Sequence, residues 1–80
     1  MLLRAAQILR GRAEELAYWE TLENGKPISQ ARAEVDGCAG MFEYAAGLAR
    51  TLHGDAFNNL GDGMVGLVTR EPIGVVGLIT

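Results

Sequence analysis

The sequence is poor in thiol and imidazole groups: its 80 residues include one cysteine, Cys38, and one histidine, His53. A single cysteine excludes a disulfide within the chain. One cysteine with one histidine also cannot supply a Cys/His zinc site. Absence of disulfides is typical of reducing compartments, so we expect a cytoplasmic location.

Long apolar runs and concentrated positive charge are also missing. No stretch of about 18 apolar residues occurs, so no membrane span is expected. Arg4 and Arg10 interrupt the region where a signal peptide would carry its apolar core. The net charge is −3, with 7 Lys and Arg against 10 Asp and Glu. This charge disfavours nucleic acid as a partner, because binding a phosphate backbone requires a basic face.

The remaining composition is that of a folded protein, with 49% hydrophobic and 21% charged residues. Disordered chains are poorer in large apolar residues. A chain of this length allows at most one small domain. Its own core would be marginal, because it buries only about 60% of its unfolded surface.

The first half of the chain predicts helices. Apolar residues at helical spacing indicate one helix over Leu2–Arg10 and a second over Arg12–Glu23, meeting near Gly11. Asn24-Gly25 offers the left-handed conformation that ends a helix, and Pro27 can begin the next one.

A third helix is indicated by an apolar stripe with steps of three and four residues: Val35, Cys38, Phe42, Ala45, Ala49 and Leu52. His53-Gly54-Asp55 would end it. Three glycines in this helix, each costing roughly 1 kcal/mol against alanine, suggest either close helix contact or a break near Asp36-Gly37.

The second half predicts strands. Residues 58–63 have the composition of a loop, Met64–Thr69 alternate as a strand does, and Pro72 limits that strand. Val75–Ile79 is apolar on both faces, as in a strand inside a covered sheet. Helices followed by strands suit an α/β or α+β protein with a larger sheet, of which residues 1–80 would form a partial domain: 1–54 helical, 64–80 strands.

Four positions could carry chemistry, and each has a plainer interpretation. Cys38 on the apolar stripe is expected to be a small buried hydrophobe, because no activating base is implied. Lys26 is expected to cap the carbonyls of the preceding helix and less so to bind a ligand. Gly74-Val75-Val76-Gly77 lacks both phosphate-loop fingerprints and suits close backbone packing or a bulge. Asp36 is by default a solvated carboxylate, because a hard cation needs several oxygen ligands.

Three segments together resemble the aldehyde dehydrogenase superfamily: Glu20–Pro27 (ETLENGKP), Phe42–Gly47 (FEYAAG) and Arg70–Thr80. One departure is Ala45, where the family often has a second aromatic residue. The tail looks closest to betaine-aldehyde-like members. The resemblance implies oxidation of an aldehyde to a carboxylic acid with NAD or NADP, through a thioester on a cysteine. It also implies a Rossmann-like cofactor domain and a homodimer or homotetramer.

The resemblance carries few functional residues into this chain. The family's nucleophile, general base and oxyanion-binding asparagine would all follow residue 80, so the chain alone is expected to be inactive. Ile79 and Thr80 correspond to the strand end that borders the cofactor, in agreement with ligand binding at the carboxyl ends of strands. Asp36, after Val35, corresponds to a ligand of a structural potassium or sodium ion, whose other ligands would lie outside the chain.

Two other interpretations stay open. The chain could be a free-standing helical interaction module ending in a β-hairpin, which would have to bury Val75–Ile79 against its own helices or a partner, because two strands alone are barely stable. It could also be a stand-alone dinucleotide-binding unit, although one strand cannot form the required crevice.

Overall fold

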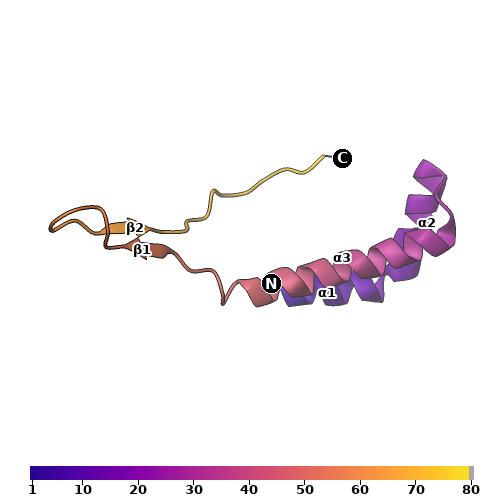
Figure 1. Cartoon of the computed structure of the whole chain (residues 1–80). Coiled ribbons are helices and arrows are strands. Elements are labelled where there is room, and N and C mark those ends of the chain that lie inside the picture. Colours follow the sequence, from indigo (N-terminus) through magenta and orange to yellow (C-terminus); the bar gives the residue numbers. More distant parts are fainter. Residues whose placement is uncertain (80) are drawn as a thin grey trace.

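The computed structural model describes residues 1–79. In chain order the elements are α1 (Leu2–Gly11), α2 (Ala13–Asn24), α3 (Ile28–Leu48), β1 (Asp55–Phe57) and β2 (Gly66–Val68). Figure 1 shows the helices at one end of the molecule and the two strands at the other. The three expected helices are confirmed. The radius of gyration is 19.7 Å, against about 12 Å for a compact domain of this length. The chain therefore does not close around a single core.

The helix boundaries follow from local residue chemistry. Arg12 separates α1 from α2 with φ −115° and ψ 19°, and Glu14 and Glu15 lie in the first turn of α2, where negative charge suits the helix dipole. At the other end, Gly25 has φ 74° and donates its N–H to the Thr21 carbonyl at 2.9 Å. This left-handed cap is the one that Asn24-Gly25 predicts.

Helix α3 is continuous through all three of its glycines. Neither alternative predicted for these glycines is found: the helix runs unbroken past Asp36-Gly37, and a Cβ at Gly37, Gly40 or Gly47 would meet no atom within 4 Å, so no close helix contact lies there. The helix ends at Leu48, where the Thr51 hydroxyl donates to the Leu48 carbonyl at 3.1 Å. The stripe was predicted to continue to Leu52, which instead lies beyond the helix.

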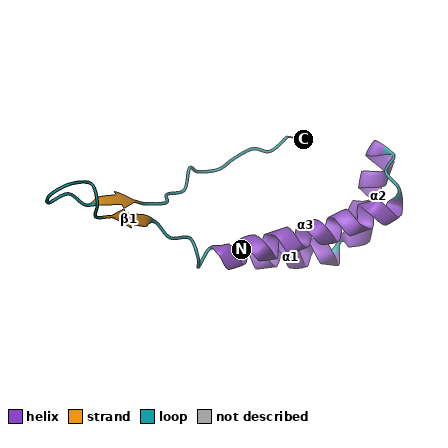
Figure 2. Cartoon of the chain, in the orientation of Figure 1, coloured by secondary structure: helices purple, strands orange, loops and turns teal. Residues whose placement is uncertain are grey.

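The helical core is a seam of alanines. Helix α3 packs along both α1 and α2 (Figure 2). The residues that are fully buried are all small: Ala6, Ala17, Ala31 and Ala39. Of the predicted stripe, Val35 is half-buried at the seam, whereas Cys38, Phe42 and Ala45 are exposed. Small side chains allow close approach of the helix axes, so the contact falls on the alanine face and leaves the larger apolar side chains uncovered.

The strands form an antiparallel pair, with Asp55 opposite Val68 and Phe57 opposite Gly66. The predicted strand over Met64–Thr69 is present but shorter, and its partner at Asp55–Phe57 was not predicted. The connecting loop contains Gly61 and Gly63, both with positive φ, which agrees with the loop expected at 58–63.

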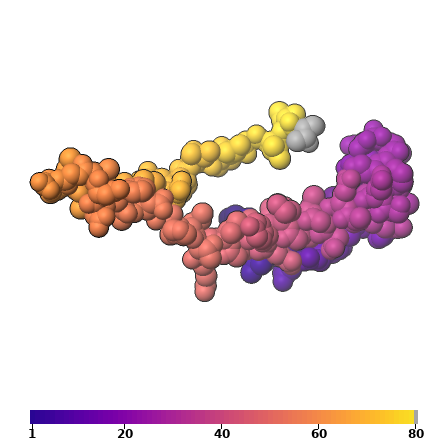
Figure 3. Space-filling model, viewed as in Figure 1, coloured from indigo at the N-terminus to yellow at the C-terminus, as the bar shows by residue number. Residues whose placement is uncertain are grey.

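The predicted strand at Val75–Ile79 is not formed. This segment has no regular structure up to residue 79, and the side chains of Val75 and Ile79 are 105% and 98% exposed. Figure 3 shows it standing clear of the helices. A strand apolar on both faces needs neighbouring strands and two covering layers, and residues 1–79 provide neither. The Rossmann-like sheet of the α/β expectation is therefore not present in the described part of the chain.

Candidate functional site

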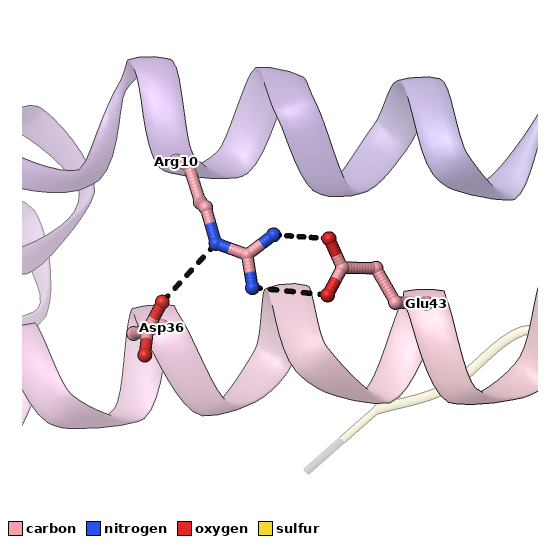
Figure 4. A network of polar contacts seen from close by, with 3 residues as sticks. All are labelled: Arg10, Asp36 and Glu43. Carbon is pink, nitrogen blue, oxygen red and sulfur yellow. Dashed lines mark hydrogen bonds and ion pairs between the residues drawn. The ribbon is translucent and has the colours of Figure 1, made fainter.

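The polar groups that could form a site lie between the helices. Arg10, in the last turn of α1, reaches two acidic residues of α3 (Figure 4). Its Nε donates to Asp36 Oδ1 at 3.2 Å, and its two terminal nitrogens donate to the two carboxylate oxygens of Glu43. The hydrogen bond from the guanidinium lowers the pKa of Glu43, and the hydrogen bonds that Arg10 donates to Glu43 and then to Asp36 raise the pKa of Arg10. This is a charge-assisted bidentate pair with an additional acceptor.

A second cluster surrounds Lys26. Its Nζ donates to Glu20 of α2 at 2.9 Å and to Glu34 of α3. The prediction that Lys26 caps helix carbonyls was wrong, because two side-chain carboxylates take up its donors. The hydrogen bond from Lys26 lowers the pKa of Glu20. Lys26 therefore links two helices across the turn that connects them.

A third link joins Arg32 of α3 to Glu14 of α2. The Arg32 guanidinium donates to both oxygens of Glu14 at distances of 2.8 to 3.1 Å. Sequence reasoning missed this pair and the Arg10–Glu43 pair. Their partners are 18 and 33 residues apart, so no helical spacing rule signals them.

Cys38 is exposed, and the prediction of a buried cysteine was wrong. The reason is the rotation of α3, which turns the alanine face inward. Cys38 lies beside a hollow of about 310 Å³ between the helices, with Leu9, Leu16 and Trp19 also on its walls. The histidine does not activate it: His53 lies beyond the end of α3, with Nδ1 2.8 Å from the Thr51 carbonyl oxygen. The described residues thus contain no cysteine–histidine pair for nucleophilic catalysis.

The predicted cation ligand, Asp36, is 74% exposed and already accepts a hydrogen bond from Arg10. Within residues 1–79 no group of three His, Cys, Asp or Glu side chains gathers to hold a metal ion. A hard cation requires several oxygen ligands, and the acidic side chains of these residues do not gather to supply them. The role of Asp36 as a cation ligand stays a prediction, because its other ligands were expected outside the chain.

The predicted cofactor-binding residues lie at the end of the chain. Ile79 is on the exposed C-terminal segment, and Thr80 lies outside the described residues. A Cβ at Gly74 or Gly77 would meet no atom within 4 Å, so the close packing predicted there is not found. Gly74 instead adopts φ 108°. The cofactor role of Ile79 and Thr80 stays a prediction.

The described residues thus form three helices that ion pairs link to one another, followed by two short strands and an extended apolar tail. No helix within residues 1–79 is long and apolar enough to span a membrane. The sequence profile of the aldehyde dehydrogenase family matches residues 1–80. The chain belongs to the aldehyde dehydrogenase family.

Individual relatives agree with this assignment. The chain is 45% identical to mouse 4-trimethylaminobutyraldehyde dehydrogenase over 75 residues, covering 94% of the chain and 15% of that protein. It is 38% identical to betaine aldehyde dehydrogenase of Bacillus subtilis strain 168 over 80 residues, covering 100% of the chain and 16% of that protein.

The fold of the chain also resembles part of a solved aldehyde dehydrogenase structure. The chain resembles the crystal structure of NAD-dependent aldehyde dehydrogenase from Sinorhizobium meliloti with a TM-score of 0.72 and 50% sequence identity, over 82% of the chain and 13% of that protein. The chain thus spans about a sixth of the length of its relatives.

Proposed function

We propose that this chain is part of an NAD(P)-dependent aldehyde dehydrogenase that oxidises an aldehyde to a carboxylic acid through a cysteine thioester. The similarity to aldehyde dehydrogenases over nearly the whole chain carries this proposal. The NAD-dependent relative from Sinorhizobium meliloti supports NAD as the cofactor.

The substrate we propose is an aldehyde with an amino or quaternary ammonium group. The relatives include enzymes named for 4-trimethylaminobutyraldehyde, aminoaldehydes and betaine aldehyde, from a mammal, a plant and a bacterium. The enzyme would be a cytoplasmic homodimer or homotetramer, as the family resemblance implies.

In this proposal the described residues have a structural role and no catalytic one. Cys38 has no activating base beside it, and the ionic clusters at Arg10, Lys26 and Arg32 link helices to one another. When NAD is bound, its nicotinamide would accept the hydride from the substrate. Residues 1–79 contribute helices that support the domain in which that transfer takes place.

The test compares two proteins in one assay. The full-length protein containing this chain is supplied with betaine aldehyde or 4-aminobutyraldehyde, and reduction of NAD⁺ and NADP⁺ is followed at 340 nm. We expect turnover with at least one cofactor and slower turnover with acetaldehyde. The isolated chain should give none. Turnover by the isolated chain would disprove the structural role, and absence of any aldehyde oxidation by the full-length protein would disprove the activity.

The alternative of a free-standing interaction module receives no support from the packing. That alternative requires Val75–Ile79 to be buried against the helices. The large apolar side chains of this segment are at least two-thirds exposed, which favours a segment that belongs to a larger sheet.

A further inference from the structure

The position at which the family resemblance places a monovalent metal ion is already beside a positive charge of the chain itself. Asp36 Oδ1 accepts a hydrogen bond from Arg10 Nε at 3.2 Å. The same guanidinium is held by both oxygens of Glu43, so it cannot leave Asp36 without also disturbing a bidentate pair. Figure 4 shows Arg10 between the two carboxylates, which lie two helical turns apart on one side of α3.

We propose that Arg10 is the internal counter-cation of Asp36, and that Asp36 binds no monovalent metal ion in this protein. An arginine stays charged at every pH at which the protein is folded. The positive charge at Asp36 is therefore permanent and part of the chain.

Electrostatics and ligand number both support this inference. A metal ion at Asp36 would lie within a few ångströms of the guanidinium, and like charges at that separation repel. Within residues 1–79 no group of three His, Cys, Asp or Glu side chains gathers at Asp36. This part of the chain therefore offers the ion fewer ligands from such side chains than the several oxygen ligands that a hard cation takes.

The remaining charge does not require an ion either. Two carboxylates and one guanidinium carry a net charge of −1. The excess resides near Asp36, whose side chain is 74% exposed, whereas Glu43 is 44% exposed. Water solvates an exposed carboxylate well, so this charge needs no bound partner.

The test measures thermal unfolding of the full-length protein in KCl, NaCl and choline chloride at equal ionic strength, which keeps non-specific screening constant. The readout is independent of the proposed activity. The variants are Arg10→Gln and Asp36→Asn. Arg12→Gln is the matched control, because within residues 1–79 the one ion pair of Arg12 is with Glu15, three residues along the chain. Arg10→Lys keeps the charge if Arg10→Gln fails to fold.

We expect the wild-type unfolding temperature to be the same in the three salts, or to change equally in wild type and Asp36→Asn. Arg10→Gln should lower it by about 2 °C more than Arg12→Gln does. An increase in KCl or NaCl over choline chloride that Asp36→Asn abolishes would overturn the proposal. Equal effects of Arg10→Gln and Arg12→Gln would overturn it as well. If Arg10→Gln does not fold, Arg10→Lys is measured in its place. Its unfolding temperature should be the same in KCl, NaCl and choline chloride, and a higher value in KCl or NaCl would overturn the proposal.

Discussion

Gly54 lies so close to Val68 that a Cβ on Gly54 would be 1.9 Å from the Val68 carbonyl oxygen. The two residues flank the paired strands, Gly54 just before β1 and Val68 at the end of β2. Only a residue without a side chain allows the two backbones to approach in this way. The strand pairing therefore depends on this glycine.

Replacing Gly54 with alanine should separate the ends of β1 and β2. The added methyl group cannot fit at 1.9 Å, and the backbone must move at a cost of about 1–3 kcal/mol. We expect faster exchange of the ladder amides at residues 66–68, measured by NMR. Gly77→Ala is the control, since a Cβ there meets no atom within 4 Å. Unchanged exchange in Gly54→Ala would contradict the prediction.

Replacement by alanine should change the free energy of unfolding in opposite directions at Gly25 and Gly37. Gly25 has φ 74°, which disfavours any residue with a Cβ, so Gly25→Ala should destabilise the helices by about 1 kcal/mol. Gly37 lies inside α3, where an added Cβ would meet no atom within 4 Å, so Gly37→Ala should stabilise by about 1 kcal/mol. Urea unfolding followed by circular dichroism measures both. Two shifts of the same sign would contradict this pair of predictions.

The sequence predicts the helices well because their signals are local. The boundary at Gly11, the cap at Gly25 and the acidic first turn of α2 each depend on neighbours in the chain. The face that α3 buries was predicted less well. Apolar spacing predicts burial of the side of α3 that carries Cys38 and Phe42. The side that packs against the other helices instead carries Ala31 and Ala39, because helices approach closely only where their side chains are small.

The candidate site was predictable only in part, for a related reason. The resemblance indicates Asp36, but nothing in its neighbourhood along the sequence indicates Arg10, which is 26 residues away. The strand at Val75–Ile79 was predicted from its apolar residues alone. Strand formation also requires partners, and residues 1–79 do not supply them.

The helix assembly should weaken in acid. Hydrogen bonds from Arg32, Arg10 and Lys26 lower the pKa values of Glu14, Glu43 and Glu20 from the ordinary value of 4.5. A lowered pKa in the folded state means that the stabilisation is complete above the unfolded pKa. It is lost as the pH falls from about 4.5 through the lower folded values.

Helix content and unfolding temperature followed from pH 7 to pH 2 measure this loss. The double variant Glu14→Gln/Glu43→Gln serves as the control, because it removes two of the titrating groups. It should start less stable at pH 7 and lose less on acidification. An identical pH profile in wild type and the double variant would show that these pairs do not contribute, as is common for exposed ion pairs.

The apolar tail should exchange its amides rapidly in the isolated chain. Val75–Ile79 has no strand partner, and the side chains of Ile73 and Leu78 are 94% and 87% exposed, so neither hydrogen bonding nor burial protects the backbone. Exchange near the rate of an unstructured peptide is expected by NMR or mass spectrometry, with Ala39 of α3 as the protected reference. In the full-length protein the same amides should become protected, because a strand apolar on both faces is stable inside a covered sheet. Protection as strong as that of Ala39 in the isolated chain would instead favour the free-standing module.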